Sequence, residues 1–211
     1  MNYLVVLRWR KKNDDRELFT KEQLIDEFSI DELNKSPAVF DQKKIDWYNE
    51  QYIRKFTPEE LSKKVRPYIE ASSVKGWDDV FLLKLVTVEQ SRFKRLTDIV
   101  ESARIFLEKV DYDNSLLLWK DMSFDELKTN LESIFKVLES IEEGPWEIKN
   151  IEKVIADYIS ANKLQNGPVL WPLRAALTGR KKSPGPYESA YVLGRDETKN
   201  RLITAIEKCS K

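Results

Sequence analysis

Local clusters of arginine and lysine are the groups in this sequence best suited to bind a polyanion. The densest are Arg8 to Lys12, Arg92 to Arg95 and Arg180 to Lys182. The 36 basic and 36 acidic residues give a formal net charge of zero, so no field of the whole molecule adds to the attraction. Charges act over about 8–10 Å in ordinary salt. Any contact with phosphates must therefore come from these local clusters.

The residue types that most catalytic and metal sites need are scarce. The chain has no histidine and one cysteine, Cys209. This excludes an internal disulfide, a Cys/His zinc site, and Ser-His or Cys-His catalysis. Acidic pairs such as Asp78-Asp79, Asp111-Asp113 and Glu142-Glu143 stand at expected turns or helix starts, where carboxylates favour the helix dipole. We assign no catalytic residue and no metal site, although an active site built on lysines or carboxylates stays open as an alternative.

The composition predicts a folded cytoplasmic protein. Hydrophobic residues make up 41% and aromatic residues 11% of the chain, which is enough to bury a core. No apolar run approaches the roughly 20 residues that a membrane span needs, and the segment Met1 to Leu4 lacks the layout of a secretory signal. We expect a monomer that binds neither membrane nor DNA.

Helical signals dominate the chain and predict an all-α fold. Three capping boxes and the N-cap Asp41 mark helix starts, the boxes being Thr20 to Gln23, Thr57 to Glu60 and Ser123 to Glu126. Amphipathic periodicity predicts further helices at about 78–90, 96–110, 146–159 and 197–206. No strand pattern of comparable strength is present.

Glycine and proline residues are expected to mark turns between these helices. They occur at Ser36-Pro37, Pro67, Gly76, Gly144-Pro145, Gly167-Pro168, Gly179 and Ser183 to Pro186. Turn formers also interrupt the helical pattern near Phe56-Thr57 and near Asp111 to Asn114. These interruptions predict three parts, 1–56, 57–113 and 114–211.

Two sets of residues resemble the bacterial type of glutamyl-tRNA synthetase. The first comprises Asn2 to Trp9, Asp14 to Phe19, Ser36 to Asp41, Lys44 to Asn49 and Tyr52 to Arg54, and the second comprises Trp171 to Gly179 with Ser183 to Gly185. Order and spacing also match, from Asn2 to about Ile206, most weakly between Asp111 and Gly144. The resemblance implies a helical stem-contact segment (1–56) followed by a multi-helix bundle or cage of two anticodon-binding lobes (57–113 and 114–211).

The family's catalytic domain has no counterpart in these residues. In the family, a Rossmann-type domain with HIGH-like and KMSKS-like motifs precedes the residues that match Asn2, and a chain without histidine cannot contain the first motif. The resemblance therefore implies a part that binds the glutamate tRNA, tRNA(Glu), without catalysis. ATP and Mg belong to the family's catalytic domain, so we expect no cofactor here. Arg8, where the family commonly has glycine, and Arg10 to Lys12 are interpreted as surface variation.

The resemblance also implies which residues read the anticodon. Arg174 matches an arginine that contacts the first anticodon base, and Trp171 matches a position close to the middle base. Arg92 matches the position that reads the third base, where arginine suits cytosine and disfavours guanine. The loop that lies against the first base corresponds to Ser183, Pro184, Gly185 and Pro186.

Each of these residues also has a plain structural interpretation. Arg174 fits a helix surface, Arg92 fits a solvated position, and Ser183 to Pro186 fits an ordinary turn. Trp171 fits a packing role with its indole N–H bonded to a carbonyl, and Phe93 is expected in the core. For the chain as a whole, the alternative is a free-standing helical module that binds another protein.

Overall fold

The computed structural model describes residues 2–9, 14–35, 38–141 and 144–209. Within these ranges it contains ten α-helices, three short 3-10 helices and no strand, which confirms the all-α prediction. The basic residues Arg10 to Lys12, the turn Ser36-Pro37 and the acidic pair Glu142-Glu143 lie outside the described residues. The elements are α1 (Asn2–Val6), α2 (Lys21–Glu27), η1 (Ile30–Glu32), α3 (Gln42–Ile53), α4 (Pro58–Glu70), α5 (Asp79–Glu89), η2 (Gln90–Arg92), α6 (Asp98–Leu107), η3 (Asn114–Leu117), α7 (Phe124–Glu139), α8 (Ile148–Ala161), α9 (Asn166–Thr178) and α10 (Pro186–Lys208).

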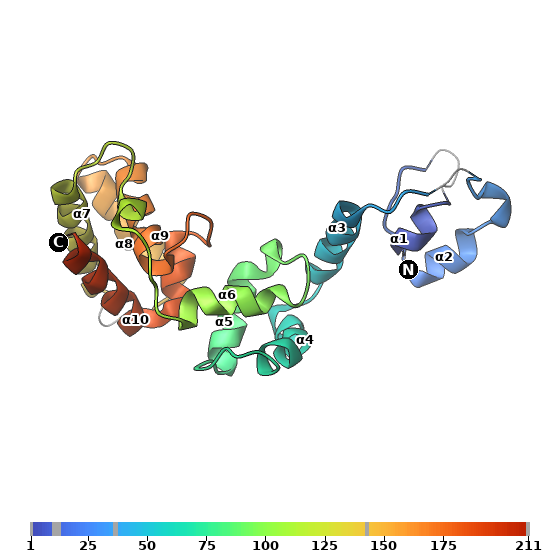
Figure 1. Ribbon diagram of the computed structural model, residues 1–211, viewed down its shortest axis with the longest axis horizontal. Coiled ribbons are helices and arrows are strands. Elements are labelled where there is room, and N and C mark those ends of the chain that lie inside the picture. Colours follow the sequence, from blue (N-terminus) through green and yellow to red (C-terminus); the bar gives the residue numbers. More distant parts are fainter. Residues whose placement is uncertain (1, 10–13, 36–37, 142–143, 210–211) are drawn as a thin grey trace.

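The helices follow one another along an elongated arc (Figure 1). An N-terminal segment with α1 and α2 lies at one end, and a C-terminal lobe of α7 to α10 lies at the other. Helix α3 leads from the N-terminal segment into a middle lobe of α4, α5 and α6. Separate hydrophobic clusters fill the middle and C-terminal lobes.

The predicted capping residues begin the helices as expected. Thr20, Thr57 and Ser123 each accept a bond from a backbone N–H in the first turn while a Gln or Glu side chain bonds back to the cap backbone. Asp41 accepts from the amides of Lys43 and Lys44 at the start of α3. These short-range bonds satisfy N–H groups that have no partner within the helix.

Two expected turns are wrong. Pro67 lies inside α4, and Gly167-Pro168 lies in the first turn of α9. Helix α9 also contains Pro172, which has no N–H for the carbonyl of Pro168 one turn earlier. The side-chain amide of Asn130 on α7 donates to that carbonyl at 3.3 Å. A tertiary contact thus offsets part of the cost of proline within the helix.

Helix α10 is broken at Gly194 and serves both lobes. Gly194 has φ 78° and ψ 173°, a conformation that essentially only glycine adopts. Before the break, Val192 packs in the core of the middle lobe, and after it Leu202 and Ala205 pack in the C-terminal lobe. The sequence predicted only the second half, at 197–206. The domain boundaries after 56 and 113 stay predictions, and Val192 shows that the two cores share an element.

The N-terminal segment leaves several large apolar side chains exposed. Examples are Leu4, Ile25, Ile30, Val39 and Phe40. Grouped exposed apolar side chains are typical of contact surfaces. Among the described residues, no helix combines the length and the apolar character needed to cross a membrane.

Candidate nucleic-acid interface

A guanidinium over an indole ring forms the centre of the candidate site, on helix α9. The Cζ of Arg174 lies 4.7 Å from the centre of the Trp171 ring. A terminal nitrogen of the same guanidinium donates to the carbonyl of Lys181 at 3.1 Å. Arg174 is half-buried rather than sealed in the core. Its guanidinium is therefore held at the surface between a helix and the loop that follows it.

The Trp171 ring is held in place from behind. Its Nε1–H donates to the carbonyl of Leu116 at 2.9 Å, and the Trp119 ring centre lies 5.8 Å away at an angle of 49°. Trp119 in turn packs so closely on Gly167 that a Cβ there would lie 2.5 Å from the ring. The hydrogen bond expected for a packing tryptophan is present. A half-buried, fixed ring can still offer its remaining surface to a base.

The loop between α9 and α10 is closed by contacts within the C-terminal lobe. Gly179 ends α9 in the left-handed conformation, at φ 62°. The hydroxyls of Thr178 and Ser183 are 3.1 Å apart across the loop. Ser183 and Pro184 are buried, while Gly185 caps α10 and Pro186 occupies its first turn. For Ser183 and Pro184 this geometry favours shaping the loop over touching a ligand with their side chains.

Three consecutive cations stand on this loop. Arg180, Lys181 and Lys182 are all exposed. In Figure 1 the loop lies on the side of the C-terminal lobe that faces the middle lobe. A local positive surface therefore adjoins the Arg174–Trp171 pair, as attraction of phosphates requires.

Arg92 lies in the middle lobe, at the end of η2, and is exposed. Its backbone is anchored by Gln90, whose side-chain amide donates to the carbonyls of Ile53 at 2.9 Å and Phe56 at 2.7 Å. Phe93 is 1% exposed, which confirms its prediction as a core residue. The exposed Lys94 and Arg95 extend the positive surface.

Glu89 is a buried carboxylic acid immediately before this segment. Burial raises its pKa, and the charge of Arg92 partly counteracts that rise. Arg92 therefore affects the charge state of the lobe's interior as well as its surface.

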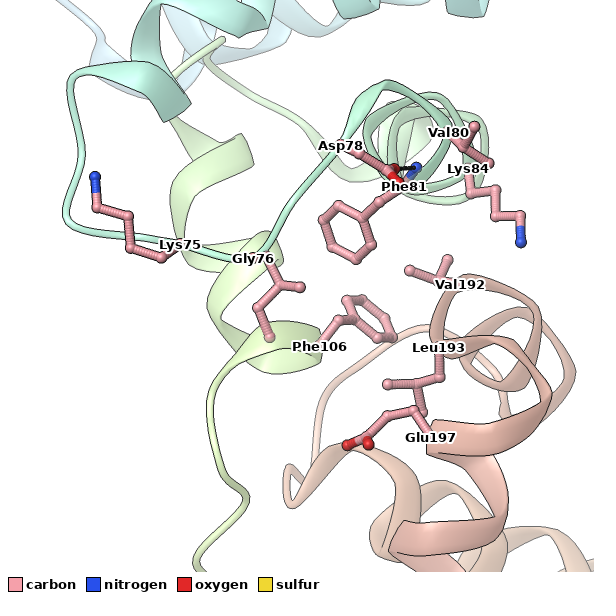
Figure 2. Close-up of a pocket in the computed structure, with 11 residues that line it drawn as sticks. Lys75, Gly76, Asp78, Val80, Phe81, Lys84, Phe106, Val192, Leu193 and Glu197 are labelled. Carbon is pink, nitrogen blue, oxygen red and sulfur yellow. Dashed lines mark hydrogen bonds between the residues drawn. The ribbon is translucent and has the colours of Figure 1, made fainter.

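The predicted residues fall into two groups. Trp171, Arg174 and the 183–186 loop share one site on the C-terminal lobe, whereas Arg92 belongs to the middle lobe. The lobes meet along a cleft of about 430 Å³, where Phe81 and Phe106 face Val192 and Leu193 (Figure 2). How the lobes are joined thus determines how the two groups are spaced.

Three supporting residues were missed from the sequence. Gln90 and Trp119 hold predicted site residues in place, and Arg201 joins the lobes through a buried guanidinium. Arg201 has Glu197 four residues before it, so in sequence the two resemble an ordinary surface ion pair. No signal along the chain distinguishes such a pair from a buried one.

Comparison with known protein families identifies the family of this chain. A family model described as an anticodon binding domain matches residues 60–206. The chain belongs to the anticodon-binding domain family. This family's match spans the middle lobe and the C-terminal lobe, including every residue predicted to read a base.

Individual relatives agree with this assignment. The glutamate–tRNA ligases of Clostridium kluyveri and Clostridium tetani have 36% and 37% sequence identity to this chain. Both alignments cover 99% of its residues. A solved glutamate–tRNA ligase from Elizabethkingia meningosepticum, in complex with its amino acid, superposes on 98% of the chain with a TM-score of 0.79 and 25% identity. The resemblance to glutamyl-tRNA synthetases is thereby confirmed. The chain spans 42% of the length of the two clostridial relatives and 40% of the solved chain.

Proposed function

We propose that this chain binds the anticodon stem-loop of tRNA(Glu) and supplies anticodon reading to a glutamate–tRNA ligase. The observation that carries the proposal is the Arg174 guanidinium, stacked on Trp171 at 4.7 Å and bonded to the Lys181 carbonyl at 3.1 Å. An arginine fixed in this way needs little further ordering to stack on an unpaired base or to donate its remaining N–H groups. RNA sequence is mostly read from such unpaired bases.

Each site residue has a role in the proposal. Arg174 contacts the first anticodon base, Trp171 lies near the middle base, and Arg92 reads the third. Ser183 and Pro184 shape the loop from inside, and Gly185 and Pro186 direct the chain into α10 beside the first base. Phosphate contacts come from the exposed cations, namely Arg92, Lys94, Arg95, Arg180, Lys181 and Lys182.

The names of the relatives support tRNA(Glu) as the partner, since each is a glutamate–tRNA ligase. Because the chain spans about two fifths of their length, we assign glutamate attachment, with its ATP and Mg, to the part of such a ligase that these 211 residues do not match. We propose no catalytic residue and no cofactor site in the chain itself.

Binding of a labelled anticodon stem-loop tests the proposal. We expect the chain to bind the glutamate-type RNA, and the affinity to fall steeply between a low and a high salt concentration because phosphate contacts release counterions. Arg174→Lys should lower the affinity by about tenfold, since lysine keeps the charge but loses the planar fork and the stacking.

The chain contains a matched control for this substitution. Arg66 also lies over an indole, with its Cζ 5.6 Å from the Trp77 ring centre, and it pairs with Asp79 at the start of α5, whereas Arg92 follows the end of that helix. Arg66→Lys should leave RNA affinity unchanged. Equal affinities of the Arg174→Lys and wild-type chains would remove Arg174 from the site. Absence of salt-dependent RNA binding by the wild-type chain would favour a protein-interaction module instead.

A further inference from the structure

We infer that Arg201 is a positioning residue for anticodon reading, which holds the first-base site on the C-terminal lobe and the third-base site on the middle lobe at one fixed spacing. The inference rests on the proposed function. It concerns a residue that contacts no proposed base and acts through the backbone of two other helices.

The Arg201 side chain is 7% exposed, and all of its nitrogens are engaged. A guanidinium presents five N–H donors in a planar fork, and the structure gives it five acceptors. These are the carbonyls of Ile105 at 2.9 Å, Leu177 at 2.6 Å, Phe106 at 2.6 Å and Glu108 at 3.3 Å, and the Glu197 carboxylate at 2.8 Å.

The four carbonyl acceptors belong to the ends of two helices in different lobes. Ile105, Phe106 and Glu108 lie at the end of α6, and Leu177 lies in the last turn of α9. Carbonyls at helix ends have no partner within the helix and carry the negative end of the dipole. One buried cation therefore neutralises and joins both helix ends. Lysine has three donors and no fork, so it cannot replace all five bonds.

Each joined helix leads to a proposed reading element. On α9, Leu177 is three residues after Arg174 and two residues before the loop 179–185 that leads to α10. At the other end of α6, the Asp98 carboxylate accepts from the backbone amides of Lys94 at 2.8 Å and Arg95 at 2.9 Å, which fixes the segment after Arg92. The ten residues of α6 thus connect the two sites. The segment after Arg92 is bonded to the start of this helix, and Arg201 is bonded to its end.

The interface between the lobes also contains apolar packing and an open cleft. Val192 is buried in the core of the middle lobe and Leu193 packs against the same core, while a cleft of about 430 Å³ lies beside them, next to the break at Gly194 (Figure 2). Glu197, which bonds to Arg201, also lines this cleft. The glycine break has open space beside it, so movement of one lobe against the other is opposed by the packing of Val192 and by the bonds of Arg201. Of these two, only the bonds of Arg201 fix the end of α6 to the end of α9.

Fixed spacing matters when one RNA contacts both lobes. Contact at the first site raises the effective concentration of the third base at the second site, but only if the spacing matches. Loss of Arg201 should therefore weaken the RNA that engages both sites. It should affect much less an RNA that engages only one.

A four-RNA comparison measures this coupling. The RNAs are the glutamate-type anticodon stem-loop, a first-base variant, a third-base variant and the double variant, each titrated with wild-type chain, Arg201→Lys and Arg201→Met. We expect Arg201→Met to lower the affinity for the matched RNA by about tenfold and for the three variants by less than about threefold. Arg201→Lys should lie between wild type and Arg201→Met, because it keeps the charge and some of the bonds.

The outcomes separate three cases. An equal loss for all four RNAs, or no loss for the matched RNA, overturns the inference, because either shows that the residue does not couple the sites. A wild-type chain that binds all four RNAs equally overturns the proposed function itself.

Glu197→Gln is the second variant if Arg201→Met does not fold. The Glu197 side chain is 46% exposed, and the substitution leaves the four carbonyl bonds of Arg201 in place. It should lower the affinity for the matched RNA alone, by about twofold to threefold, and a uniform effect or none would again overturn the inference.

Discussion

Arg174 and Trp171 form a cation–π pair three residues apart on α9, with the guanidinium 4.7 Å from the ring centre and a further bond to the Lys181 carbonyl. Residues three apart lie on the same face of a helix. The pair therefore joins helix to loop on one surface, beside the exposed cations of residues 180–182. Substitutions in this surface and in the residues that support it should have distinct effects on stability and on RNA affinity.

Replacing Trp171 with phenylalanine should separate its packing role from base contact. The change removes the indole donor to the Leu116 carbonyl, and we expect a loss of about 1–3 kcal/mol in the free energy of unfolding. We also expect RNA affinity to fall about threefold to tenfold, because the stacking surface shrinks. Denaturant unfolding and RNA titration measure the two effects.

Trp146 is the matched control for this substitution. Its indole donates to the Ala190 carbonyl at 2.8 Å, and Arg195 lies over its ring at 5.1 Å. Trp146→Phe should lower stability by a similar amount and leave RNA affinity unchanged. Parallel losses of affinity in both variants would show that Trp171 acts on binding only through the fold.

Gly179 should tolerate no side chain. It has a positive φ of 62°, and a Cβ would lie 2.2 Å from Val110 Cγ1. In Gly179→Ala, backbone strain should lower the free energy of unfolding by about 1–2 kcal/mol. Overpacking should lower it by about 1–3 kcal/mol more. Gly76 has a φ of 84° and open space where a Cβ would lie. Gly76→Ala should therefore lose only the part of the unfolding free energy that comes from backbone strain. Equal losses in denaturant unfolding would contradict the contact with Val110.

Helix starts and the core Phe93 could be predicted from sequence because their causes are local. A capping box lies within four residues, and an apolar stripe repeats within one helix. The continuation of α9 through Pro172 depends on Asn130 in another helix, and the break at Gly194 depends on packing against two lobes. The burial of Ser183, Pro184 and Arg201 likewise arises from tertiary contacts, which spacing along the chain does not encode.

Glu89 should make stability depend on pH. Its pKa in the folded state lies above the ordinary value of 4.5. At a pH between these two values, the folded state keeps a proton that the unfolded state has lost. The contribution of the protonated Glu89 carboxyl to the free energy of unfolding is fully present below pH 4.5. This contribution is lost as the pH rises through the pKa of the folded state. Glu89→Gln should therefore be more stable than wild type at about pH 8, with a gap that narrows toward acid. A gap that widens toward acid, measured by thermal unfolding, would reverse this assignment.

Arg92→Gln should remove discrimination at the third anticodon base. We expect the wild-type chain to bind a stem-loop with cytosine at this position about tenfold more tightly than one with guanine, which corresponds to about 1.4 kcal/mol. The variant should bind both alike. Arg95→Gln is the control, since this exposed arginine three residues away should weaken both RNAs equally by loss of phosphate attraction. Retained preference in Arg92→Gln would assign third-base reading to another residue.

The ratio of two dissociation constants for the unmodified chain decides whether it reads an anticodon. One RNA carries the glutamate anticodon, and the other has the same stem with all three anticodon bases changed. We predict that the first binds at least about tenfold more tightly in the same salt, because both carry the same phosphates and only the bases differ. A ratio of one would show that the chain binds the RNA without reading its anticodon.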